Sequence, residues 1–123
     1  MSILEIANCI IEFIRLEVSR AQSNGVVLGL SGGIDSSVAV SLATKALGNN
    51  RVLGLILPDR NVSEQKDIDD AVELSKQLGI KYHIIDITEI KVMRILAVRL
   101  PIDFFSNGNR SRYFCLISVI SII

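Results

Sequence analysis

A glycine-rich loop between an apolar strand and a helix constrains this chain more than any other feature. Residues 26–30 form an apolar run of strand length, and from Ser36 onward the apolar residues follow helical spacing. Between the two, Gly32 and Gly33 are predicted to adopt positive φ angles, which turn backbone N–H groups toward one point with no Cβ in the way. Because this point lies at a helix N-terminus, the loop is predicted to bind an anion.

The polar residues of this loop indicate phosphate accompanied by a cation. The hydroxyls of Ser31, Ser36 and Ser37 are predicted to donate hydrogen bonds to phosphate oxygens. The carboxylate of Asp35 would repel phosphate unless a cation stood between them. Since Mg²⁺ binds readily through one carboxylate together with phosphate oxygens, Asp35 is the predicted metal ligand.

Other known loops match this sequence less well. The Walker loop needs a lysine that does not follow these glycines, and the dinucleotide fingerprint G-x-G-x-x-G does not occur. Residues 29–33 match the hydrolase elbow G-x-S-x-G, but that fold needs a histidine after its acid, and His83 is the only histidine. A glycine-rich turn that binds nothing is the last alternative, and so specific a combination of residues disfavours it.

Strands and helices alternate along the whole chain. Ser2 and Glu5 form a predicted capping box for the first helix, and Ser63 is predicted to cap a later one. On the helix after the loop, Val38 and Ala43 are predicted to face the sheet. The alternation predicts an α/β fold with a doubly wound parallel sheet. The predicted helices cover residues 3–22, 36–47, 63–78 and 88–98, and the predicted strands cover residues 26–30, 52–57 and 81–87.

The segment from Asp59 to Ser63 follows the second predicted strand. In open α/β sheets, ligands bind at the carboxyl ends of the strands, so this loop borders the expected site. Arg60 is therefore a candidate nucleotide contact, with a merely solvated arginine as an equal alternative. The acidic residues at the start of the next helix are interpreted as solvated charges that favour the helix dipole.

Composition narrows the choice of partners. With 13 basic and 13 acidic residues, the formal net charge is zero, so neither nucleic acid nor an anionic membrane is expected as a partner. Cys9 and Cys115 lie among apolar residues and are predicted to be buried thiols in a reducing cytoplasm. No basic segment precedes the first apolar residues, so no targeting segment is predicted.

The loop sequence Ser-Gly-Gly-Ile-Asp-Ser at residues 31–36 resembles the pyrophosphate-binding loop of the N-type ATP pyrophosphatases, which split ATP into AMP and pyrophosphate. Within that superfamily, Leu-Ile-Leu-Pro-Asp-Arg-Asn at residues 55–61, the acidic helix after it and Leu-Gly-Ile at residues 78–80 resemble ammonia-dependent NAD synthetase. The resemblance covers about residues 3–109.

This resemblance implies a cytoplasmic ligase of NAD biosynthesis. Such enzymes use ATP and Mg²⁺ to adenylate the carboxylate of deamido-NAD, ammonia then displaces AMP to give NAD, and the enzymes are homodimers. No residue is assigned as an acid or base, because ammonia can itself be the nucleophile and proximity can suffice. With Asp35 as the implied Mg²⁺ ligand, the implied ATP- and pyrophosphate-binding residues are Gly29, Leu30, Ser31, Gly32, Gly33, Ile34, Asp35 and Ser36.

The sequence departs from that family's pattern after Asn109. The family continues with Ala-Arg-x-Arg, whereas here Arg110 and Arg112 come too early and an uncharged, largely apolar run follows. The Thr-Gly-Asn-x-Ser-Glu loop, whose glutamate is the second metal ligand, does not occur in residues 1–123. These residues are interpreted as the N-terminal portion of one synthetase domain, with residues 110–123 as a divergent or truncated tail.

The family resemblance implies that residues 26–30 form a central strand with a fourth strand beside it, and the sequence pattern predicts only three strands. Residues 26–30 are expected to expose an unpaired apolar strand edge, and the 123-residue chain alone is expected to make no NAD. Two further functions remain open: another superfamily enzyme, such as a GMP synthetase subunit, and a noncatalytic nucleotide-binding module. An assay that compares deamido-NAD with XMP as substrate distinguishes NAD synthetase from a GMP synthetase subunit. An assay for pyrophosphate release from ATP distinguishes an enzyme from a binding module, which releases none.

Overall fold

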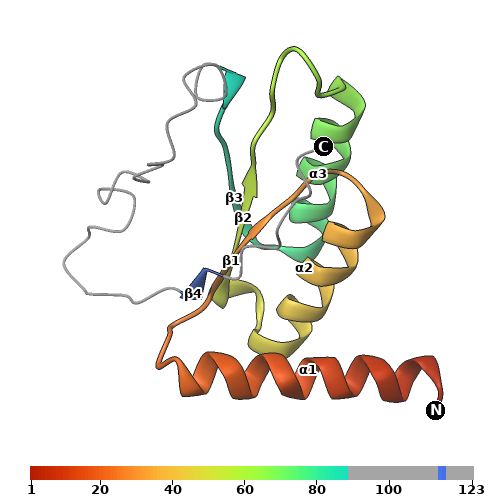
Figure 1. The fold of residues 1–123 in the computed structure, drawn as a ribbon, viewed down its shortest axis with the longest axis vertical. Coiled ribbons are helices and arrows are strands. Elements are labelled where there is room, and N and C mark those ends of the chain that lie inside the picture. Colours follow the sequence, from red (N-terminus) through yellow and green to blue (C-terminus); the bar gives the residue numbers. More distant parts are fainter. Residues whose placement is uncertain (89–113, 116–123) are drawn as a thin grey trace.

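The computed structural model describes residues 1–88 and the backbone of residues 114–115. Within these residues it shows a parallel sheet flanked by helices (Figure 1). The predicted helix from Thr88 onward and most of the tail lie outside the described residues. The elements are α1 (Ile3–Arg20), β1 (Val26–Gly29), α2 (Ile34–Leu47), η1 (Asn49–Arg51), β2 (Val52–Ile56), α3 (Gln65–Leu78), β3 (Lys81–Ile84) and β4 (Phe114–Cys115).

The strands lie in the order β3-β2-β1-β4 and all pair in parallel. Val26 is opposite Val52, and Leu53 is opposite Lys81. This order matches the first four strands of the doubly wound order 3-2-1-4-5-6. The predicted parallel α/β sheet is thus confirmed.

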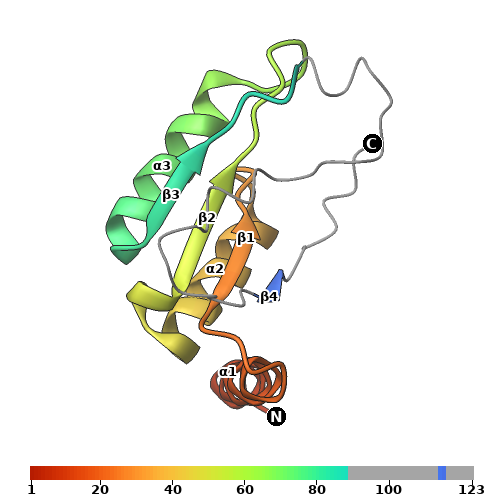
Figure 2. The ribbon, with the colours of Figure 1, turned by 90° about the vertical axis from the view of Figure 1, so that its left-hand side faces the viewer.

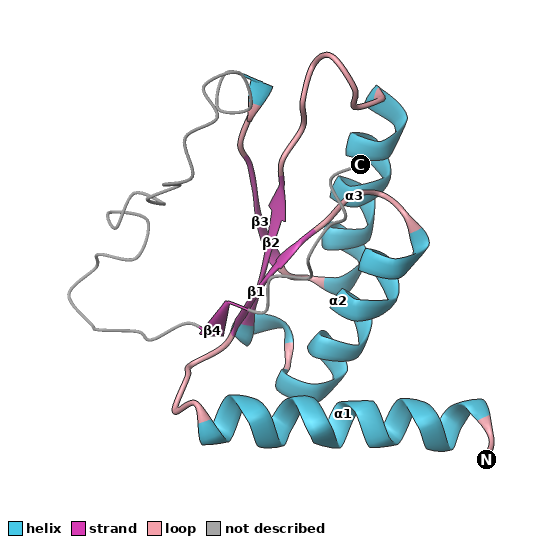
Figure 3. Cartoon of the chain, viewed as in Figure 1, coloured by secondary structure: helices cyan, strands magenta, loops and turns pink. Residues whose placement is uncertain are grey.

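The hydrophobic core lies between the sheet and the two helices that follow its strands. Figures 1 and 3 show α2 and α3 side by side on one face of the sheet. Alternate residues of β1 and its extension point to this face and are buried, as period-two alternation requires. Val40 of α2 is fully buried among them, whereas Val38, predicted to face the sheet, is 51% exposed. The core cluster comprises Val18, Val26, Leu28, Leu30, Val40, Ala43, Val52, Ile56, Ala71 and Ile80.

The edge of β1 is paired, contrary to the expectation of an unpaired strand. Phe114 is opposite Val26 and Cys115 is opposite Val27, so β4 pairs with the amino-terminal half of β1. β1 therefore lies between β2 and β4. The sequence pattern did not predict β4 because two residues are too few for a detectable strand period.

Helix α1 crosses below the end of the sheet (Figure 2). Its predicted capping box is present: Glu5 N donates to Ser2 Oγ (3.2 Å) and Ser2 N donates to Glu5 Oε2 (2.6 Å). Arg15 joins α1 to α2 by donating from Nε to the Ala46 carbonyl oxygen (2.9 Å). Cys9, predicted to be buried, is exposed, because no residue in the amino-terminal half of α1 is buried: Ile3 and Leu4 there are 85% and 76% exposed.

Several element boundaries differ from prediction. Helix α2 begins two residues early because Gly33 is its N-cap, and α3 begins at Gln65 with Glu64 as N-cap. Ser63 is not that cap, since its Oγ instead accepts a hydrogen bond from Asp59 N (2.9 Å). None of the helices in residues 1–88 is long and apolar enough to cross a membrane.

Candidate nucleotide-binding site

The loop at residues 31–36 lies where the topology of the sheet changes direction. It joins the carboxyl end of β1 to α2, with β2 on one side of β1 and β4 on the other. In open α/β sheets, ligands bind in the crevice outside the strand ends at such a switch point. The loop thus occupies the position expected of a ligand site in this architecture.

Serine hydroxyls hold the loop in its turn. Ser31 N donates to Ser36 Oγ (3.1 Å), the Ser31 and Ser36 hydroxyl oxygens lie 3.0 Å apart, and Gly33 N donates to Ser31 Oγ (3.2 Å). Ser36 is buried, whereas Ser31 is exposed. In the structure these two hydroxyls therefore bond within the loop, and of the pair Ser31 is the one accessible to a ligand.

The two glycines have different roles. Gly32 has the predicted positive φ, +78°, and a Cβ there would lie 2.4 Å from the Asp67 carbonyl oxygen, so the loop packs directly on the first turn of α3. Gly33 has a φ of −85°, which makes the prediction of positive φ wrong for this residue. A Cβ on Gly33 would approach only Ser31 Oγ, at 3.3 Å.

Backbone amides at the start of α2 remain available for an anion. The first intrahelical bond runs from Ser37 N to the Gly33 carbonyl oxygen (3.3 Å), so the amides of Ile34, Asp35 and Ser36 precede the intrahelical ladder. The hydroxyl of Ser37 also donates to the Gly33 oxygen (2.6 Å) and is not turned toward a phosphate as predicted. Free amides and the positive end of the helix dipole together favour a phosphate here.

Asp35 is an exposed carboxylate in the first turn of α2. It borders an otherwise apolar cavity of about 320 Å³ between α1, β1 and α2, beside residues such as Phe13 and Val38. Residues 1–88 contain no cluster of three or more acidic, histidine or cysteine side chains that could hold a metal. Mg²⁺ at Asp35 would therefore need phosphate oxygens and water as further ligands, which suits the preference of Mg²⁺ for few protein ligands.

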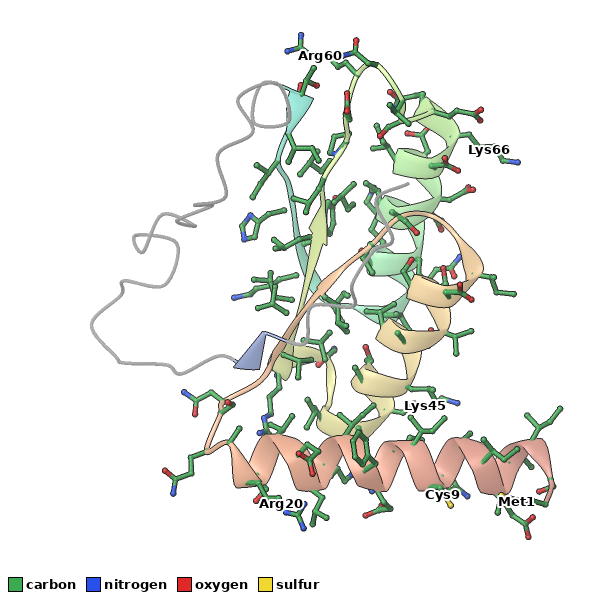
Figure 4. The ribbon with its side chains drawn as sticks, viewed as in Figure 1. Met1, Cys9, Arg20, Lys45, Arg60 and Lys66 are labelled. Carbon is green, nitrogen blue, oxygen red and sulfur yellow. The ribbon has the colours of Figure 1, made fainter. Side chains whose placement is uncertain are left out.

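Arg60 is not brought to the glycine-rich loop. It lies at the far tip of the loop between β2 and α3 (Figure 4), where its Nε is 2.9 Å from Asp86 Oδ2. Sequence reasoning did not single out Asp86 or Thr88 as partners of Arg60. The signal that would have found them is the parallel pairing of β2 with β3, which places the residues after each strand side by side.

Asp59, which precedes Arg60, is a buried polar residue that the sequence did not mark as functional. Its Oδ1 accepts a hydrogen bond from Asn61 N (3.0 Å), and its carbonyl oxygen accepts from Ser63 N (2.7 Å). These bonds are typical of an Asx turn, in which an aspartate fixes the backbone that follows it. Asp59 therefore gives the loop that carries Arg60 a defined shape.

The structure also argues against the hydrolase alternative. His83 lies on β3, opposite Leu55 of β2, whereas Ser31 follows β1. β2 separates the two strands, which puts their backbones roughly 9–10 Å apart at the spacing of neighbouring strands. The only histidine is therefore not placed beside the serine of the G-x-S-x-G match.

Comparisons with known proteins show a family that most of this chain matches. A family model described as NAD synthase matches residues 6–113. The chain is 55% identical over 89 residues to an NH(3)-dependent NAD(+) synthetase of Methanocaldococcus jannaschii. This match covers 72% of this chain and 34% of that protein. It is 41% identical over 104 residues to the enzyme of the same name from Hyperthermus butylicus, covering 85% of the chain and 38% of that protein. The chain thus spans about a third of the length of these curated relatives.

Solved structures show the same similarity. An NH3-dependent NAD synthetase from Campylobacter jejuni matches with a TM-score of 0.69 at 35% identity, over 81% of this chain and 44% of that one. An NMN synthetase from Francisella tularensis matches with a TM-score of 0.69 at 34% identity, over 76% of this chain and 38% of that one. A glutamine-dependent NAD+ synthetase from Acinetobacter baumannii, solved with ADP, also has a TM-score of 0.69, at 33% identity over 85% of this chain and 19% of that one.

Proposed function

Because the chain belongs to the NAD synthase family, we propose that it forms the ATP-binding part of an ammonia-dependent NAD synthetase. The complete protein would amidate deamido-NAD by way of an adenylated carboxylate, releasing AMP and pyrophosphate. The single observation that carries this proposal is the loop at residues 31–36, with its free amides at a helix N-terminus and its exposed carboxylate. The ADP bound to the Acinetobacter baumannii relative supports a nucleotide ligand.

The geometry of the loop suits the chemistry of adenylation. In that step the β- and γ-phosphates leave as pyrophosphate, so negative charge develops on the leaving group. Donors fixed in advance at that position stabilise the charge without further reorganisation. We assign this role to the amides of Ile34, Asp35 and Ser36. Gly33 leaves room for the phosphates, the exposed hydroxyl of Ser31 donates to them, and Gly32 lets the loop pack against α3.

Further parts of the proposal concern Mg²⁺ and the complete assembly. Asp35 would hold Mg²⁺ between its carboxylate and the phosphates, and Mg²⁺ when bound would neutralise charge on the leaving group. In keeping with the family resemblance, we also propose that the complete protein is a homodimer in the cytoplasm, with no nucleic-acid or membrane partner. Arg60 is proposed to contact the nucleotide.

A measurement of ATP binding by the 123-residue chain tests the proposal that this chain is the ATP-binding part of the enzyme. We expect ATP with Mg²⁺ to bind at least about tenfold more tightly than AMP, because charged phosphates receive the loop's charge-assisted hydrogen bonds. Isothermal titration calorimetry of the chain with ATP and then AMP measures the difference. Equal affinities, or no binding of either nucleotide, would contradict the proposal.

A second candidate substrate is a mononucleotide, because one similar structure is named an NMN synthetase. Both reactions amidate a nicotinate carboxylate, so the loop would serve either. An assay of the complete protein with ATP, Mg²⁺ and ammonium separates them when deamido-NAD, nicotinate mononucleotide and XMP are supplied in turn. Amide formed chiefly from deamido-NAD supports the proposal, and amide formed chiefly from either of the others replaces it.

A further inference from the structure

The ends of β2 and β3 are joined by a ring of contacts around Arg60. Backbone pairing continues past the two strands, with Ile85 N donating to the Ile56 carbonyl oxygen (2.8 Å) and Ile87 N to that of Pro58 (3.0 Å). This register brings the two residues that follow Ile85 and Ile87, Asp86 and Thr88, beside the loop that begins at Asp59. Contact between the two loops is therefore a consequence of parallel strand pairing.

The ring consists of Arg60, Thr88 and Asp86, which are joined to one another by hydrogen bonds and one ion pair. Arg60 N donates to Thr88 Oγ1 (2.9 Å), Thr88 N donates to Asp86 Oδ1 (2.9 Å), and the Thr88 hydroxyl donates to that same oxygen. Asp86 Oδ2 then pairs with Arg60 Nε at 2.9 Å. Hydrogen bonds from Thr88, with Arg60 nearby, hold the pKa of Asp86 below its usual range, so the carboxylate is charged at neutral pH.

The ring leaves most of the guanidinium free. Arginine carries five N–H donors, and within the described part of the chain Arg60 uses only its Nε for the side-chain pair. The side chain is 70% exposed at the carboxyl edge of the sheet, the edge at which open α/β sheets bind ligands. The two terminal nitrogens thus retain four donors in a planar fork, the geometry that matches phosphate oxygens.

We propose that Asp86 and Thr88 are positioning residues that hold the Arg60 guanidinium ready for a phosphate group of a nucleotide bound at this edge. The proposal rests on the function proposed above and assigns roles to two residues outside the glycine-rich loop. A free arginine would have to lose rotamer freedom on binding, whereas here the 2.9 Å pair with Asp86 already restricts the side chain.

A double-mutant cycle on the 123-residue chain tests this inference by calorimetry with Mg²⁺-ATP. We expect Arg60→Ala to weaken ATP binding roughly tenfold, as loss of a charge-assisted hydrogen bond does. Asp86→Asn is expected to weaken binding severalfold in the wild-type background and to have no effect in the Arg60→Ala background. A merely structural role for Asp86 would give the same loss in both backgrounds, and that result would overturn the inference.

The chain offers a matched control in the pair Arg20–Glu17, which also has an N–O distance of 2.9 Å and an arginine that is 68% exposed. Arg20→Ala and Glu17→Gln should leave ATP affinity unchanged, because this pair lies on α1. If wild type binds ATP and Arg60→Ala binds equally well, the inference fails while the proposed function stands.

A second measurement decides the inference if wild type binds no ATP, a result that would refute the proposed function. The NMR signal of Arg60 Nε–H is followed while inorganic pyrophosphate is added. A shift that is lost in Asp86→Asn supports a guanidinium positioned for phosphate. No shift in wild type overturns the inference as well.

Discussion

Gly32→Ala is expected to cause a severe loss of nucleotide binding by the chain. A Cβ at this position would lie 2.4 Å from the Asp67 carbonyl oxygen and 2.8 Å from the Asp67 Cα, closer than folded proteins tolerate. The φ of +78° adds strain of about 1–2 kcal/mol for a residue with a Cβ. The loop must therefore move off α3, which displaces the amides that face the ligand. Calorimetry should show ATP affinity reduced roughly a hundredfold or more, because several hydrogen bonds to a charged group, worth about 1.5–3 kcal/mol each, are lost together.

Two other glycines serve as controls for this substitution. Gly79 also has a positive φ, +69°, but a Cβ there would meet only the end of the Asn49 side chain, at 3.1 Å. Gly79→Ala should lower the free energy of unfolding by less than Gly32→Ala does, and should leave ATP affinity unchanged. Gly33→Ala should have an intermediate effect on binding, because its φ is negative and its single close contact is a hydroxyl. Equal ATP affinity in wild type and Gly32→Ala would show that the loop is not the site.

Asp35→Ala is expected to remove the Mg²⁺ dependence of ATP binding. Asp35 is the sole carboxylate in the loop, and the metal would otherwise be held only by phosphate and water. The variant's affinity in saturating Mg²⁺ should therefore fall to the value that wild type shows in EDTA. Calorimetry of both proteins in the two buffers measures this.

Asp70→Ala is the matched control, since Asp70 is an exposed helical aspartate on α3 and lies outside the loop. Its Mg²⁺ dependence should equal that of wild type. A variant at Asp35 that keeps the full enhancement by Mg²⁺ would refute the assignment of the metal ligand. Loss of the enhancement in Asp70→Ala would place the metal on α3 instead.

The elements themselves were predictable because each rests on local pattern. The apolar run of β1, the helical spacing of α2 and the Gly79 helix stop lie within one or two residues of where the sequence places them. Gly32 was also predictable, since a turn this tight needs a positive φ. The prediction of a positive φ for Gly33 was wrong because this residue is the N-cap of α2, a position that requires an extended backbone.

The errors concern contacts between segments distant in sequence. Val38 and Val40 are both apolar and point to different sides of α2, so the sequence does not show which side faces the sheet. The packing of α2 on β1 buries Val40 and leaves Val38 exposed. Ser63 looks like a helix cap until the turn at Asp59 uses its hydroxyl. The Arg60 ring, likewise, depends on the register of β2 and β3, which no local pattern encodes.

The claim that the loop at residues 31–36 binds the pyrophosphate part of ATP is tested most directly by NMR. Backbone amide signals of the ¹⁵N-labelled chain are followed while Mg²⁺-pyrophosphate is added. We predict that the largest shifts fall on the amides of Gly32 through Ser36, which span the glycines and the first turn of α2, and that Gly32→Ala removes them. Largest shifts on residues outside the loop, or no shifts at millimolar pyrophosphate, would contradict the account.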